Sequence, residues 1–89
     1  MEHCAEVVIP NKYGLHARPA AEFVKLANKF SCEVIVRKEE VEVSGKSIMG
    51  VMMLAAEHGS SIVICARGDD SDAAVDALRT LVSSGFGES

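Results

Sequence analysis

The hydrophobic residues of this chain follow two periods in turn, and this alternation limits the fold more than any other feature. Alternating apolar and polar residues, or clustered β-branched residues, predict strands; apolar residues three and four apart predict helices. These patterns predict strands at Cys4–Ile9, Cys32–Val36, Val41–Val43 and Ser61–Ala66, and helices at Ala17–Phe30, Ile48–Ala56 and Ala73–Val82. So many short elements in 89 residues predict a single domain, residues 1–89, with a mixed or antiparallel sheet that carries its helices on one face.

Local signals place the ends of the predicted helices. Pro19 falls within the first turn of its helix, where a missing N–H costs nothing, so that helix is expected to begin at or just after His16. Ser47 directly precedes the second helix and is a predicted N-cap, and Gly59 is the predicted left-handed stop. The acidic segment 68–72 is expected to form a solvated loop and to cap the last helix.

Charge and hydropathy exclude several classes of protein. A net charge of −4 and a pI near 5.2 argue against a nucleic-acid-binding protein, which needs a basic surface. The N-terminus lacks the basic and apolar regions of a signal peptide, and no apolar stretch approaches the roughly 20 residues that span a bilayer. We therefore expect a cytoplasmic protein that does not insert into membranes.

The cysteines predict neither a metal site nor a redox motif. Cys4, Cys32 and Cys65 are widely spaced and form no CxxC pair. Cys32 and Cys65 lie in apolar segments and are expected to be buried thiols. Three unpaired thiols are typical of a reducing compartment.

The residues around His16 predict an anion site. At the start of a helix, free N–H groups and the positive end of the helix dipole attract negative charge. A phosphoryl group on the His16 ring would be held by the backbone N–H groups of Ala17 and Arg18, and the Arg18 guanidinium would add a charge-assisted hydrogen bond.

Two segments in the right order resemble one known family. Gly14–Ala20 (GLHARPA) and Gly45–Leu54 (GKSIMGVMML) are similar to the active-site and regulatory-serine signatures of HPr, the histidine-containing phosphocarrier of the bacterial phosphoenolpyruvate-dependent phosphotransferase system. The similarity extends from about Glu6 to the end of the chain. It implies an α+β fold, the open-faced β-sandwich with a four-stranded antiparallel sheet and three helices on one face.

The resemblance also implies a mechanism. His16 would take a phosphoryl group on Nδ1 from phosphorylated Enzyme I, loaded from phosphoenolpyruvate, and pass it to a histidine of an Enzyme IIA protein. Arg18 would steady the group and Pro19 would fix the helix start. Such a protein is a co-substrate of other enzymes rather than an enzyme, and no cofactor is implied. We expect it to act as a monomer.

The second motif predicts regulation and docking. The resemblance implies that Ser47 is phosphorylated by an HPr kinase/phosphorylase, which would place negative charge beside the docking face. The short apolar helix after Ser47 cannot bury all its side chains, and exposed apolar patches beside reactive sites mark docking surfaces. The residues expected to contact partners are Leu15, Ala20, Ile48, Met49 and Met52, while Val51 and Leu54 are expected in the core.

Two other classes of function would require motifs that differ from these. A ligand-binding or metal-binding module would need a glycine-rich loop or a chelating cysteine pair, and an acylphosphatase-like enzyme would need a phosphate-cradling loop with a catalytic Asn; none is present. Within the family, Met52–Ala56 and the segment 83–87 resemble the nitrogen-related carrier of a regulatory phosphorelay, whereas Lys46–Gly50 resembles the carriers that the kinase controls. The choice between these two branches stays open.

Overall fold

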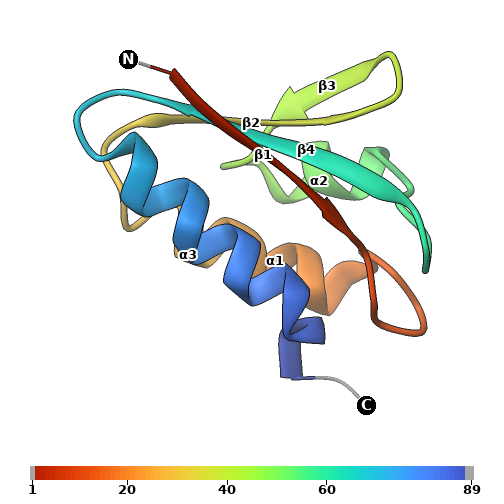
Figure 1. Ribbon diagram of the computed structural model, residues 1–89. Helices are drawn as coiled ribbons and strands as arrows, with labels where there is room; N and C mark the ends of the chain where they lie inside the picture. Colours follow the sequence, from red (N-terminus) through yellow and green to blue (C-terminus); the bar gives the residue numbers. More distant parts are fainter. Residues whose placement is uncertain (1, 88–89) are drawn as a thin grey trace.

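The computed structural model describes residues 2–87. Its strands are β1 (Glu2–Val8), β2 (Glu33–Lys38), β3 (Val41–Ser44) and β4 (Ser61–Arg67). Its helices are α1 (Ala17–Ala27), α2 (Ile48–Met53) and α3 (Ser71–Ser83), followed by a short 3₁₀ turn, η1 (Gly85–Gly87). All neighbouring strands are antiparallel, in the order β1-β4-β2-β3. Figure 1 shows α1 and α3 side by side beneath the sheet, and the predicted open-faced α+β sandwich is confirmed.

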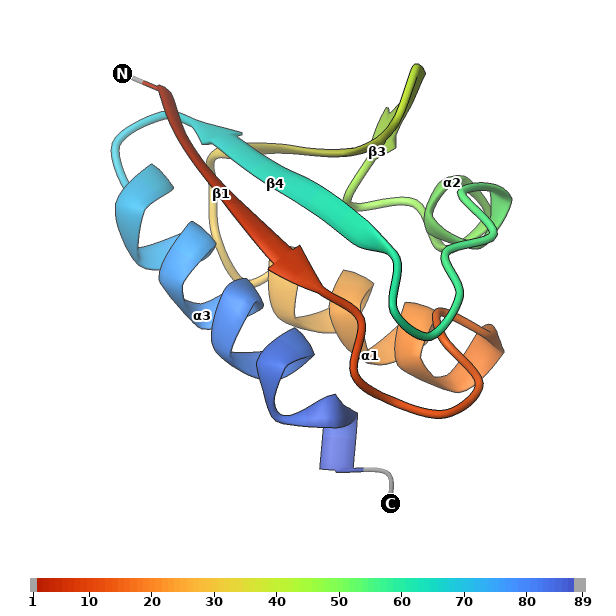
Figure 2. The same ribbon diagram turned by 45° about the vertical axis from the view of Figure 1, so that its right-hand side comes forward.

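The core lies between the sheet and the helices. Strand residues alternate between the two faces of a sheet, and on β4 this alternation turns Ile62 and Ile64, both fully buried, toward the helices. Phe23 of α1 and Leu78 of α3 are also fully buried. Figure 2 shows the two long helices along one face of the sheet and α2 set apart near β3, where it contacts α1 and β3.

Two helix ends differ from the prediction. The first helix ends at Ala27 instead of Phe30. The second ends at Met53, so the predicted extension to Ala56 and the stop at Gly59 are wrong. Ala55 takes the left-handed conformation, with φ 50°. Gly59 lies in the following turn instead, where its N–H donates to the Ile9 carbonyl over 2.8 Å.

The cysteines correct another expectation. Cys4 and Cys65 form a disulfide across 61 residues of sequence, so the prediction of three unpaired thiols is wrong. The expected burial of Cys32 and Cys65 is confirmed. The pair was missed because only the register of β1 against β4 places Cys4 opposite Cys65. The cysteines therefore do not indicate a reducing compartment. Within residues 2–87, no helix combines the length and the apolar character that a membrane span requires.

The acidic segment before α3 holds two loops together. Asp70 occupies the N-cap position of α3, but its carboxylate does not cap that helix. It accepts hydrogen bonds from the backbone N–H groups of Ser31, over 2.9 Å, and Cys32, over 3.0 Å. The bond from Ser31 is the main cause that lowers the pKa of Asp70. Burial, followed by the hydrogen bond to Asp70, raises the pKa of the Cys32 thiol.

Candidate functional site

His16 is the N-cap residue of α1, with extended backbone and an exposed side chain. Its carbonyl oxygen accepts the first hydrogen bond of the helix from the Ala20 N–H over 3.0 Å. The helix thus begins directly after His16, as the position of Pro19 predicts. This placement puts the imidazole at the positive end of the helix dipole, with its ring in solvent.

The first turn of α1 presents two backbone donors beside His16. Within residues 2–87, the structure gives no hydrogen bond to the N–H of Ala17 or of Arg18. Pro19, the third helical residue, has no N–H and is fully buried. No acidic side chain lies in this turn. Together with the exposed Arg18 guanidinium, these two donors form an arrangement that can hold a doubly charged anion on the imidazole.

The loop before His16 is braced by three hydrogen bonds. The Asn11 side-chain amide donates to the Gly14 carbonyl over 2.8 Å, and the Gly14 N–H donates back to the Asn11 carbonyl over 3.2 Å. The Leu15 N–H donates to the carbonyl of Ala56 over 2.9 Å. Gly14 has φ 67°, and a Cβ there would collide with the Ala56 carbonyl and lie 2.9 Å from the Glu57 Cα. Only glycine fits this position.

Two residues near His16 were not singled out from the sequence. The Tyr13 ring meets the His16 ring edge to face, with centroids 6.1 Å apart. The Lys12 ammonium lies 5.4 Å from the Tyr13 ring centroid. No sequence signal marks Tyr13, since turn residues carry no pattern that predicts ring contacts. The buried Asn11, in contrast, is a typical turn residue whose bracing role could have been anticipated.

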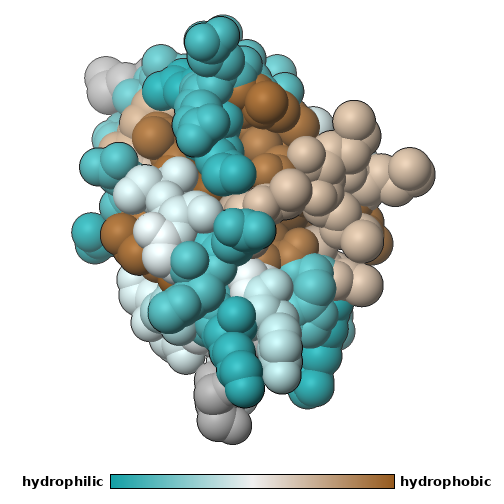
Figure 3. Space-filling view, turned by 90° about the vertical axis from the view of Figure 1, so that its right-hand side faces the viewer, coloured by the Kyte–Doolittle hydropathy of each residue, from teal (hydrophilic) through white to brown (hydrophobic). Residues whose placement is uncertain are grey.

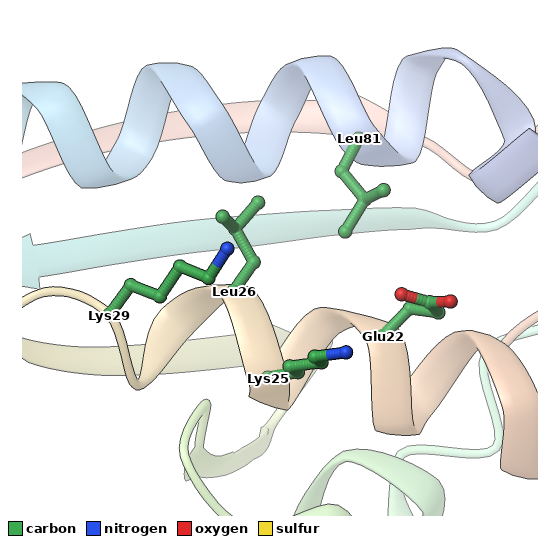
Figure 4. Close-up of a pocket in the computed structure, with 5 residues that line it drawn as sticks. All are labelled: Glu22, Lys25, Leu26, Lys29 and Leu81. Carbon is green, nitrogen blue, oxygen red and sulfur yellow. The ribbon is translucent and has the colours of Figure 1, made fainter.

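The hollows on the surface near α1 are small. Figure 4 shows Leu26 of α1 and Leu81 of α3 approaching each other between the two helices, with Glu22, Lys25 and Lys29 at the rim. The hollow between these side chains has a volume of about 220 Å³, which is below the range of pockets that enclose small organic ligands. Within residues 2–87, the hollow between α1 and α3 is therefore too small to enclose such a ligand, while His16 at the start of α1 is exposed.

Ser47 caps α2 as predicted. Its Oγ accepts a hydrogen bond from the Gly50 N–H over 3.0 Å, and its carbonyl accepts from the Val51 N–H over 2.9 Å. The residue is half-buried. Lys46, just before it, directs its ammonium to the Phe30 carbonyl over 2.7 Å, which fastens the start of α2 to the end of the α1 segment.

An apolar patch projects from α2. We define the α2 patch as four exposed side chains: Ile48 (45% exposed), Met49 (74%), Met52 (42%) and Met53 (72%). In Figure 3 the projecting surface on the right-hand side is tan to brown, on the side of the molecule that carries α2. The expected exposure of Ile48, Met49 and Met52 and the burial of Val51 and Leu54 are confirmed. Met53 was missed.

Two other predicted docking residues are not at the surface. Leu15 is 4% exposed and Ala20 is not exposed at all, so the prediction that their side chains contact partners is wrong. Leu15 points into the core because the Leu15–Ala56 hydrogen bond draws its backbone against the segment after α2. Ala20 is in the row of α1 that faces the sheet.

The site can be compared with known proteins. A family model for the phosphorylation site of the HPr component of the phosphotransferase system (PTS) matches residues 4–84. The phosphocarrier protein HPr of Pseudomonas aeruginosa is 48% identical over 84 residues, 93% of each chain. The phosphocarrier protein NPr of Shewanella violacea is 40% identical over 83 residues, 93% of this chain and 91% of that protein.

The fold agrees with these relatives. The crystal structure of HPr-C-His from Thermoanaerobacter tengcongensis superposes with a TM-score of 0.94 and 46% identity over 98% of both chains. The matched region contains both motifs of the sequence, the His16 loop and the Ser47 cap. The chain belongs to the HPr family, the phosphocarrier proteins of the phosphotransferase system.

Proposed function

We propose that His16 accepts a phosphoryl group from phosphorylated Enzyme I, which is loaded from phosphoenolpyruvate, and donates it to an Enzyme IIA protein. The observation that carries this proposal is the exposed His16 ring at the first turn of α1, beside the N–H groups of Ala17 and Arg18 that have no hydrogen bond within residues 2–87. A phosphoryl group there meets two donors and the guanidinium of Arg18.

The transfer is a simple exchange of bonds at phosphorus. A ring nitrogen of His16, Nδ1 by family resemblance, attacks with its lone pair, and a P–N bond forms as the bond from phosphorus to the donor breaks. Transfer onward to Enzyme IIA breaks the same P–N bond. The chain's own contribution is to place the ring and to hold the phosphoryl oxygens. It acts as a carrier rather than an enzyme, needs no cofactor or metal, and works as a cytoplasmic monomer.

Partner proteins dock on the α2 patch and on the surface around His16. Methionine side chains adapt to different surfaces, so one patch can serve Enzyme I and Enzyme IIA in turn. Support comes from the exposure of four apolar side chains on a helix that packs against α1, the helix that His16 caps.

Ser47 is the proposed regulatory site, phosphorylated by an HPr kinase/phosphorylase. A phosphate on Oγ would keep an acceptor at the cap of α2 but would add about two negative charges next to the apolar patch. Desolvating that charge in an interface is costly. Phosphorylated Ser47 should therefore slow transfer from Enzyme I.

The test is labelling with Enzyme I and radioactive phosphoenolpyruvate. The wild type should take up an acid-labile label, His16→Ala should take up none, and His58→Ala should label like the wild type. His58 is a fair control because it is also exposed, in the turn before β4. An unlabelled wild type, or a labelled His16→Ala variant, would overturn the proposal.

The second candidate is a nitrogen-related carrier in a regulatory phosphorelay without sugar transport. It is supported by the match to the Shewanella violacea NPr and by the stretch Met52–Ala56. Both candidates share the chemistry at His16 and differ in the acceptor. Labelled protein should be offered to a sugar-type and a nitrogen-type Enzyme IIA in parallel, and the faster acceptor decides between them.

A further inference from the structure

The disulfide lies far from the phosphoryl chemistry and has no part in it. Cys4 and Cys65 are directly opposed in the register of β1 and β4, with Cα atoms 4.1 Å apart. β1 is one of the two edge strands of the sheet, so β4 is its only strand neighbour within residues 2–87. The bond therefore fastens an edge strand to a central one.

The disulfide faces away from the helices. On β1, Val7 is buried in the core and Ala5 packs against it, so alternation turns Cys4 to the opposite face. Figure 1 shows that no helix covers this face. Cys4 is exposed while Cys65 is 8% exposed. A thiol in solution can reach the Cys4 sulfur.

The residues around the disulfide could also be interpreted as a metal site. Within residues 2–87, Glu2, Cys4 and Cys65 bring one potential ligand atom each to within 4.8 Å of one another. Both sulfurs are used in the disulfide, and the Glu2 carboxylate lies 3.6 Å from the Arg67 guanidinium. In the oxidised state that the structure shows, the cluster therefore offers no thiolate to a metal and presents a disulfide.

We propose that Cys4 and Cys65 form a reversible redox clasp on β1. A dithiol opens the clasp: its thiolate attacks the exposed Cys4 sulfur, the S–S bond breaks, and Cys65 leaves and takes up a proton. The second thiol of the dithiol then displaces Cys4, so two electrons and two protons pass to the protein and the dithiol becomes a disulfide. A disulfide oxidant reverses each step and closes the clasp.

Opening the clasp loosens β1 and leaves the His16 loop in place. The ladder between β1 and β4 still forms but opens more often than in the oxidised protein, and the hydrogen bond between the His3 ring and the Ser71 hydroxyl, 3.0 Å in the oxidised structure, still links the start of β1 to α3. The loop after β1 has separate anchors, since the Ile9 N–H donates to the Ser60 carbonyl over 2.8 Å. Redox state should thus control the mobility of an edge strand without switching off the phosphoryl site.

The first experiment measures the clasp itself. The Cys32→Ser variant removes the third thiol and is equilibrated in buffers of reduced and oxidised dithiothreitol at increasing ratio, then alkylated and weighed by mass spectrometry. We expect a single two-electron transition from no alkyl group to two, the same in both directions. Alkylation at every ratio, or a disulfide that opens only in denaturant, would overturn the proposal.

The second experiment measures the effect on β1. Amide hydrogen exchange of residues 2–8 should accelerate at least tenfold on reduction of the wild type and should be equally fast in Cys4→Ser under both conditions. The α1 amides should change less than twofold. Cys4 is exposed, so this variant is expected to fold; if it does not, the reduced wild type alone decides. Unchanged exchange in β1 on reduction would overturn the proposal.

Discussion

The backbone N–H of Leu15 donates to the carbonyl oxygen of Ala56 over 2.9 Å. This bond joins the residue before His16 to the segment that follows α2. The loop that carries the proposed phosphoryl site and the helix that carries the apolar patch are thereby fixed to each other, although about 40 residues separate Leu15 from Ala56. A partner that docks on α2 meets His16 in a defined position.

Gly14→Ala should break this relationship. The residue has φ 67° and its new Cβ would collide with the Ala56 carbonyl. Left-handed backbone costs about 1–2 kcal/mol for alanine and overpacking adds about 1–3 kcal/mol, so the free energy of unfolding should fall by about 2–5 kcal/mol. Urea denaturation measures the loss, and labelling by Enzyme I should slow in parallel.

Gly59→Ala is the matched control for Gly14. It also has positive φ, 87°, but a Cβ there meets nothing within 4 Å. Only the backbone term of about 1–2 kcal/mol applies. If Gly14→Ala and Gly59→Ala lower the free energy of unfolding equally, contact with the Ala56 carbonyl does not contribute to the loss in Gly14→Ala.

Arg18→Gln should slow phosphoryl transfer to His16 by about ten- to a hundredfold. A hydrogen bond to a charged group contributes about 1.5–3 kcal/mol, and Arg18 is an exposed residue in the first turn of α1, two positions after His16. The transfer rate of Arg18→Lys should lie between the rates of the wild type and of Arg18→Gln, because lysine keeps the positive charge but lacks the planar guanidinium that can donate two parallel hydrogen bonds. Initial rates of labelling by Enzyme I provide the measurement. Lys25→Gln, two turns along α1, is the control and should transfer at the wild-type rate.

The sequence predicts the order and type of the elements because each has a clear hydrophobic period. It also predicts the N-cap at Ser47 and the helix start at His16, because a helix accepts a proline such as Pro19 without cost only in its first turn. Those features depend on local chemistry alone. The anion site expected at His16 came from Ala17, Arg18 and the direction of the helix, whereas the phosphocarrier chemistry expected there came from the resemblance to the HPr family.

The features that the sequence did not predict depend on long-range contacts. The sequence around Cys4 does not predict that it pairs with Cys65, because the two residues are brought opposite each other only by the register of β1 against β4. The early end of α2 at Met53 follows from the left-handed Ala55, a conformation that alanine rarely adopts. Leu15 was expected at a docking surface, but its hydrogen bond to Ala56 turns it into the core.

Ser47→Ala and Ser47→Asp should separate the capping role of this residue from its proposed regulatory role. Alanine removes the bond that Oγ accepts from Gly50 and should lower stability by about 1 kcal/mol, with little effect on transfer. Aspartate keeps a cap but adds a charge beside the α2 patch, so transfer from Enzyme I should slow while stability stays near wild type. Thermal denaturation and labelling rates are compared. If both variants slow transfer equally, charge is not the cause.

Met49→Gln with Met53→Gln should weaken docking without weakening the fold. The two side chains are 74% and 72% exposed, so replacing them leaves no cavity. We expect the KM of Enzyme I for this carrier to rise about thirtyfold at unchanged Tm, since the two side chains lose apolar contact worth about 1 kcal/mol each in the interface. Val8→Thr is the control, because Val8 is also exposed, at 52%, but is in β1. A similar rise in KM for Val8→Thr would argue against a specific patch.

Asp70→Asn should make the free energy of unfolding less dependent on pH in the acid range. The hydrogen bonds that Asp70 accepts, first from Ser31, lower its pKa below the usual 3.8. A carboxyl with a depressed pKa contributes stability above its unfolded pKa of about 3.9, and this is lost as pH falls through the folded value. Wild type should therefore be the more stable protein at pH 6, and its advantage in urea midpoint should shrink below about pH 4. Asp69→Asn, at the exposed neighbouring position, is the control; a gap between wild type and Asp70→Asn that does not change with pH would contradict the assignment.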